Sequence, residues 1–123
     1  MSGSSGSSGT GGIGTDGGRH GLAPMTKVEI VVGGEDVPAV EEVFAAAGVR
    51  GFTGVPGVSG LGHDGYHRGR LLFNEQAVLS LLLTVVPEDR VEPLLGGLRT
   101  LFEERPGVMF VSDVWVSRPD YFR

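Results

Sequence analysis

The segment of residues 57–70 carries the side chains and the backbone best suited to binding chemistry. Its glycines allow backbone N–H groups to approach an anion closely, and cationic or imidazole side chains can add donors. His63, His67, Arg68 and Arg70 would supply these donors. No Gly-Lys-Ser or Gly-Lys-Thr follows and no helix is expected there, which excludes a Walker A loop and a dinucleotide-binding fingerprint. We predict that this loop binds a ligand or a partner. A flexible hairpin without a binding role is the alternative.

Metal binding and catalysis have weaker support in the sequence. His63 and His67 are four residues apart, a spacing that presents both side chains on one face only in a helix. The glycines around them argue against a helix, so we predict no metal site, although one assembled across subunits stays open. Paired carboxylates such as Glu88-Asp89 fall at helix starts or on solvated faces. Since no serine nucleophile motif surrounds Ser59 either, we predict that the protein is not an enzyme.

The C-terminal residues include a second group of candidates. Trp115, the only tryptophan, is expected to pack in a sheet or an interface, with stacking on a base as the alternative. Arg118 is a candidate contact for an anionic group, and a surface ion pair is an equal alternative. Tyr121 and Phe122 are expected to clamp onto a neighbouring subunit, against the competing view of a disordered tail.

Composition indicates one small domain and narrows its class. The chain has 123 residues and a net charge of −5, without a cluster of Lys and Arg that would bind nucleic acid. Residues 1–24 are rich in Gly and Ser and are expected to be a flexible tag or linker, so the domain would span residues 25–123. No apolar run is long enough to cross a membrane, and no export signal is apparent. With no cysteine present, a cytoplasmic protein is expected.

The predicted elements alternate between strands and helices. Residues 28–32 alternate as a strand, and residues 36–48 have a helical apolar stripe. In that helix Asp36 is the expected N-cap, Pro38 fits the first turn and Gly48 fits the position after the C-cap. Further along, we expect a glycine-punctuated strand at residues 51–60, a mobile loop at about 57–72 and an apolar central strand at 77–86. A second helix, weakened by two glycines, is expected at residues 87–102, and a last strand at 108–116.

The order of these elements is βαββαβ, which defines an α+β, ferredoxin-like domain with an antiparallel sheet. Both helices then cover one face of the sheet. A chain this small has nothing left to cover the other face, so we predict an oligomer with closed cyclic symmetry.

Five short motifs, in the correct order, resemble the PII signalling family. They are Gly48-Val49-Arg50-Gly51-Phe52-Thr53, Gly60-Leu61-Gly62-His63, Tyr66-His67-Arg68-Gly69, Val85-Val86-Pro87-Glu88-Asp89 and Gly107-Val108-Met109-Phe110-Val111-Ser112-Asp113-Val114. The resemblance extends over almost all of residues 26–116.

The resemblance implies a homotrimer that binds adenine nucleotides in clefts between subunits and has no cofactor. By position, the cleft would be bordered by Thr53, Gly60, Leu61, Gly62 and His63, with Gly107 near the phosphates and Arg118 as a further contact. The mobile loop, called the T-loop in the family, would dock on a metabolic enzyme or a membrane transporter. Its partner-binding residues would be Asp64, Tyr66, His67, Arg68 and Arg70.

Departures from the family pattern change the expected ligand. The segment Glu103–Gly107 is short, lacks the family's phosphate-holding loop and has Val108 where a phosphate-contacting lysine would lie. We therefore expect ADP, AMP or a cyclic mononucleotide, in place of ATP with 2-oxoglutarate. The loop is similar to the PII-like branch associated with bicarbonate transporters and carboxysomes, so bicarbonate is a candidate second ligand. The alternatives are a metal-responsive trimer similar to the CutA proteins, using His63 and His67, and a small dimeric enzyme of the same architecture.

Overall fold

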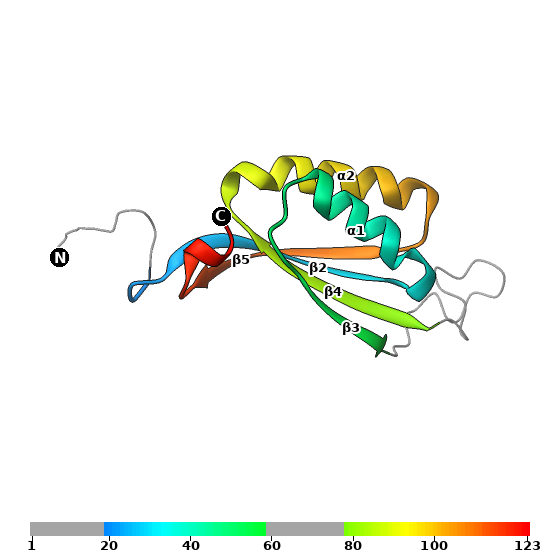
Figure 1. The fold of residues 1–123 in the computed structure, drawn as a ribbon, viewed down its shortest axis with the longest axis horizontal. Coiled ribbons are helices and arrows are strands. Elements are labelled where there is room, and N and C mark those ends of the chain that lie inside the picture. The colour runs from blue at the N-terminus through cyan, green and yellow to red at the C-terminus, as the bar shows by residue number, and fades with distance from the viewer. Residues whose placement is uncertain (1–18, 59–77) are drawn as a thin grey trace.

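The computed structural model describes residues 19–58 and 78–123, which form one antiparallel sheet with both helices on one face (Figure 1). The strand order is β3-β4-β2-β5. The elements follow the chain as β2 (Ala23–Gly33), α1 (Val37–Ala46), β3 (Thr53–Val58), β4 (Leu79–Val86), α2 (Val91–Glu104) and β5 (Val108–Val116). This arrangement confirms the predicted ferredoxin-like βαββαβ order, including an internal position for the apolar strand β4.

The hydrophobic core lies between the sheet and the two helices. Alternate residues of β2 point toward the helices, and Val28, Ile30 and Val32 are fully buried there. Ile30 pairs with Leu82 of β4, so the two side chains share this face. The helices contribute Val40, Phe44, Leu94 and Leu98 to the same cluster, and β4 adds Val86.

The start of α1 differs from the predicted cap. Asp36 occupies the N-cap position, but its side chain makes no capping hydrogen bond. Its carboxylate accepts a hydrogen bond from Arg105 at 2.7 Å instead, at the far end of α2. Asp36 is only 5% exposed, so an ion pair between elements compensates its charge in place of a cap. The predicted C-terminal signal is confirmed, because Gly48 has φ +79° just after the C-cap.

The two glycines of α2 have different surroundings. A Cβ atom at Gly97 would lie 2.8 Å from Cγ1 of Val43 on α1, whereas one at Gly96 would meet nothing within 4 Å. The pair was expected only to weaken the helix. Gly97 in fact allows α1 and α2 to approach each other closely, while Gly96 has no packing role of this kind.

The first strand also begins earlier than predicted. β2 begins at Ala23, before the predicted strand, because its backbone continues to pair with β5 through Ala23↔Val116 and Pro24↔Trp115. Before it, Leu22 N donates to Arg19 O at 2.7 Å, and the two intervening residues have positive φ. This geometry is a tight hairpin turn of the type I′ class. Residues 19–24, which were predicted to belong to a flexible segment, therefore have defined structure.

The face of the sheet that lies away from the helices carries apolar side chains. Val31 alternates with the buried core residues of β2, and Phe110 pairs with Glu29 on the same face. Phe110 is 58% exposed and Val55, on β3, is 44% exposed. Neither helix covers this face (Figure 1). The predicted open face is thus present in the single chain, and it combines exposed apolar side chains with the ion-paired Lys27 and Glu29.

Candidate functional site

A hollow of about 490 Å³ lies where β5 ends and the C-terminal tail begins. The tail forms a short 3-10 turn, Pro119–Tyr121, which folds back beside the end of the sheet (Figure 1). The hollow is lined by Trp115, Val116, Ser117, Arg118, Tyr121 and Phe122. Three aromatic rings and one guanidinium therefore converge in it. Such a lining suits a flat aromatic group that carries negative charge.

Arg118 is held inside this aromatic group. Its guanidinium lies 5.5 Å from the centroid of the Tyr121 ring, and Nη1 donates to the Tyr121 hydroxyl at 2.9 Å. Within the described part of the chain it forms no ion pair with a carboxylate, so the predicted alternative of a surface ion pair is not what the geometry shows. A guanidinium has five N–H donors, and those of Arg118 that are not bonded to Tyr121 are of the kind that binds an anionic oxygen.

Trp115 is covered by the N-terminal hairpin. The Arg19 guanidinium lies 4.2 Å from the centroid of the indole ring, which is a cation–π contact. Sequence reasoning assigned Arg19 to the flexible segment and missed it. The contact shows that the residues before Met25 take part in the structure around this hollow.

Gly107 and Thr53, two other predicted nucleotide contacts, lie far from Arg118 within a single chain. Gly107 precedes β5 and Arg118 follows it, so the nine residues of that strand separate them by about 30 Å. Thr53 lies on β3, at the opposite edge of the sheet from β5. A small ligand that touches all three residues must therefore lie between subunits.

Gly107 has a structural role that is visible without a ligand. A Cβ atom there would lie 2.4 Å from Cε1 of Phe102, on the last turn of α2. Any larger residue would therefore need the Phe102 ring to move, whether or not a phosphate binds nearby.

The predicted T-loop and most of the predicted cleft residues lie outside the described residues. These are Gly60, Leu61, Gly62 and His63 of the cleft, and Asp64, Tyr66, His67, Arg68 and Arg70 of the partner-binding loop. The two histidines of the metal alternative are among them. Within residues 19–58 and 78–123, no group of three or more His, Cys, Asp or Glu side chains is placed to hold a metal ion.

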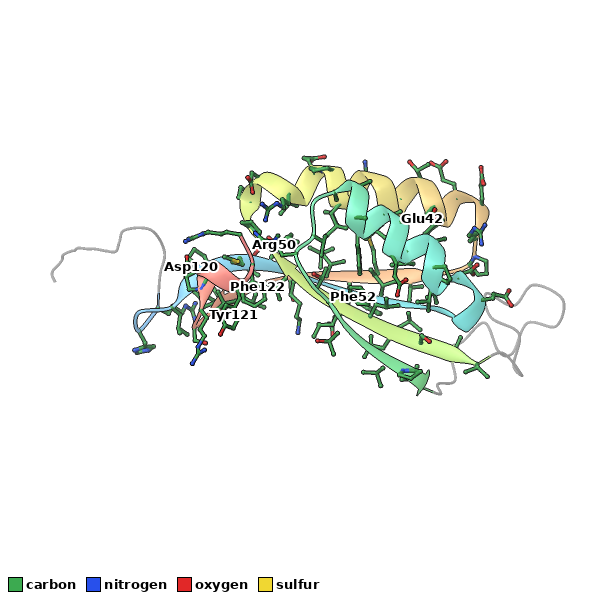
Figure 2. All side chains as sticks on the ribbon, viewed as in Figure 1. Glu42, Arg50, Phe52, Asp120, Tyr121 and Phe122 are labelled. Atoms are coloured by element: carbon green, nitrogen blue, oxygen red, sulfur yellow. The ribbon has the colours of Figure 1, made fainter. Side chains whose placement is uncertain are left out.

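Two arginines at this end of the molecule were not singled out from the sequence. Arg50 donates to the backbone carbonyl of Arg123, and Arg90 Nη1 donates to the carbonyl of Phe122 at 3.0 Å. Figure 2 shows Arg50 at the same end of the sheet as the labelled tail residues. In the sequence, only their positions could have drawn attention to them: Arg50 follows the end of the first predicted helix, and Arg90 lies at the start of the second.

The whole arrangement defines a ferredoxin-like domain with a hollow, lined by aromatic rings and an arginine, at its C-terminal tail. A family model described as "Nitrogen regulatory protein P-II" matches residues 25–121. The chain therefore belongs to the nitrogen regulatory protein P-II family, which confirms the resemblance drawn from the five motifs.

Among solved structures, the chain is similar to the PII-like protein CPII. CPII from Thiomonas intermedia K12, bound to ADP, AMP and acetate, is 38% identical, with a TM-score of 0.70 over 83% of this chain and 97% of that one. CPII bound to ADP, AMP and bicarbonate is 39% identical, with a TM-score of 0.68 over 83% of this chain and 96% of that one.

A more distant structure shares the fold alone. It is a putative PII-like signalling protein from Thermus thermophilus, 23% identical, with a TM-score of 0.65 over 83% of this chain and 98% of that one. A comparison with curated proteins found no match.

These findings give no support to the CutA-like alternative. In the part of the chain that the structure describes, no helix is long and apolar enough to cross a membrane.

Proposed function

We propose that this chain is a PII-like signal-transduction protein that binds ADP or AMP, with bicarbonate as a second ligand. The observation that carries the proposal is the 39% identity, over 83% of this chain, with CPII in complex with ADP, AMP and bicarbonate. The hollow beside Arg118 supports it, because aromatic rings can stack on an adenine base and an arginine can bind a phosphate.

The functional unit in this proposal is a homotrimer with nucleotides in its subunit clefts. The separation of Thr53, Gly107 and Arg118 within one chain supports this, since only a neighbouring subunit can complete a site that contains all three. The apolar face around Phe110 supports it independently, because a second copy would remove that surface from water.

A preference for fewer phosphates follows from the charges near Gly107. Glu103 and Glu104 are exposed and acidic, and Arg105 is engaged with Asp36 at 2.7 Å. The segment before β5 therefore offers little free positive charge to a third phosphate. We expect ADP and AMP to bind more tightly than ATP.

The proposed output is regulation of a partner and not catalysis. Nucleotide binding would favour one state of the T-loop at residues 57–72. A cytoplasmic partner would recognise that state; the candidates are a bicarbonate transporter, another transporter and a metabolic enzyme. The size of such a shift is limited by the difference in the ligand's affinity for the two states.

Isothermal titration of the full chain with ATP, ADP, AMP and cyclic AMP, with and without bicarbonate, tests the proposal. We expect saturable binding of ADP or AMP near one site per chain, and a change in that affinity when bicarbonate is added. Absence of binding to every nucleotide at millimolar concentrations would refute it.

Arg118→Ala tests the role of the hollow in the same assay. Removing the guanidinium should weaken ADP binding about tenfold or more, because a charge-assisted hydrogen bond to phosphate is lost. Arg99→Ala, an exposed position on α2, is the matched control and should bind as the parent does. Unchanged ADP and AMP affinities in Arg118→Ala would exclude Arg118 from the site.

A further inference from the structure

The C-terminal tail is attached to the body of the domain through its backbone carbonyls. The carbonyl of Phe122 accepts from Arg90, and that of Arg123 accepts from Arg50. Both donors are guanidinium groups, so both bonds are charge-assisted and stronger than bonds between neutral groups. They join segments that are 32 and 73 residues apart in sequence. The tail's position is therefore set by two side chains from other elements.

The two arginines come from neighbouring ends of the helical layer. Arg50 follows α1, in the connection to β3, and Arg90 ends the 3-10 turn Glu88–Arg90 that precedes α2. Arg90 passes beside Gly48, where a Cβ atom would lie in ordinary van der Waals contact, 3.4 Å from its Nε and 3.6 Å from its Cδ. Arg90 is half-buried and so is directed by its packing toward the tail.

The tail itself is a compact unit. Tyr121 N donates to the Arg118 carbonyl at 3.1 Å, and Phe122 N donates to the Pro119 carbonyl at 3.0 Å. The Arg118 side chain is bonded to the Tyr121 hydroxyl within the same turn. A shift of this unit would carry Arg118, Tyr121 and Phe122 together relative to Trp115, which remains on β5. These three residues form half of the lining of the hollow.

We propose that Arg50 and Arg90 are positioning residues, which fix the tail of residues 118–123 and thereby set the geometry of the pocket. This inference rests on the proposed function for the identity of the ligand, but not for the attachment of the tail. The two arginines do not line the hollow, so they act through the carbonyls of Phe122 and Arg123. Nothing in the five family motifs assigns them this role.

Arg50→Gln and Arg90→Gln, made singly and together, test the inference without any ligand. Glutamine keeps a side chain of moderate length but removes the positive charge. Trp115 is the only tryptophan and lines the pocket, so quenching of its fluorescence by acrylamide reports the position of the tail. We expect a larger quenching constant in each variant, the largest in the double variant, and no change in the control Arg99→Gln. Unchanged quenching in the double variant would overturn the inference.

ADP titration of the same proteins separates positioning from simple stabilisation. The double variant should lose about tenfold in ADP affinity, and Arg90→Lys should recover part of the loss of Arg90→Gln because an ammonium can still donate to the Phe122 carbonyl. Equal affinities in the parent and the double variant would overturn the inference.

The two proposals fail in distinguishable ways. If the parent protein binds no nucleotide, the proposed function fails, while the quenching experiment still decides whether the arginines hold the tail. Arg50 is exposed, so Arg50→Gln is expected to fold even if Arg90→Gln does not. Quenching of Trp115 in the single Arg50→Gln variant then decides whether the tail is held by these arginines.

Discussion

Asp36 is a buried carboxylate whose partner comes from the far end of the other helix. Its side chain is 7% exposed, while that of Arg105 is 49% exposed. The sequence predicted Asp36 as a helix cap because Asp is common there, and the position is right. The partner could not be predicted, since residues 36 and 105 are brought together only by the packing of α1 against α2.

Asp36→Ala should lower the free energy of unfolding by about 1–3 kcal/mol. The buried carboxylate and its bond to Arg105 are lost, but the half-exposed guanidinium can still be hydrated, which limits the cost. Urea denaturation at one fixed protein concentration measures the change, because oligomers gain stability with concentration.

Asp89→Ala is the matched control for this substitution. Asp89 is an exposed acid in the first turn before α2, and it forms no ion pair with another described residue. Its removal should cost less than about 0.5 kcal/mol. Equal losses in the two variants would show that the Asp36–Arg105 pair does not stabilise the fold.

At the scale of elements, the contact between α1 and α2 depends on one of two adjacent glycines. Gly97 faces Val43 and Gly96 faces open space. Sequence reasoning identified the glycines as a local weakness of α2, which is correct for Gly96 alone. The difference between them follows from the rotation of α2 against α1, and the apolar stripe of the helix defines that rotation only approximately.

Gly97→Ala and Gly96→Ala should therefore change stability in opposite directions. The first should destabilise by about 1–3 kcal/mol, because Val43 must move to admit the methyl group. The second should stabilise by about 0.5–1 kcal/mol, because alanine is the better helix former. Midpoints of thermal unfolding, followed by circular dichroism, compare the two. A gain in both variants would contradict the described packing of the helices.

The strands were predicted more completely in the centre than at the ends. The apolar runs of β2 and β4 identify their interiors, since both contribute alternate buried residues. The extension of β2 to Ala23 was missed because glycines and a proline precede Met25, and only the register with Val116 on β5 shows why the strand continues. Local composition does not contain that information.

At the scale of the whole molecule, the uncovered face of the sheet is the surface that the proposed trimer would bury. Its position followed from the βαββαβ order, and the family followed from the five motifs. The site was less predictable, because Arg118 was identified but its aromatic surroundings come from a tail that folds back on the sheet. Arg19, Arg50 and Arg90 reach the tail or its neighbours through tertiary contacts that no motif encodes.

Phe110→Lys should break the proposed trimer. Phe110 is 58% exposed on the face away from the helices, where a charge would oppose burial against a second copy. Val111→Lys is the matched control, because Val111 is 48% exposed and points to the other face of the same strand. Light scattering coupled to size exclusion should give a smaller species for the first variant and a trimer for the second. Trimers in both would exclude this face from the interface.

Native mass spectrometry of the protein with ADP tests the central claim most directly, because one spectrum reports both assembly and ligand. The proposed function predicts a trimer that takes up to one ADP per chain, with AMP competing for the same positions. A trimer that takes up neither nucleotide, or a monomer that binds one without assembling, would contradict it.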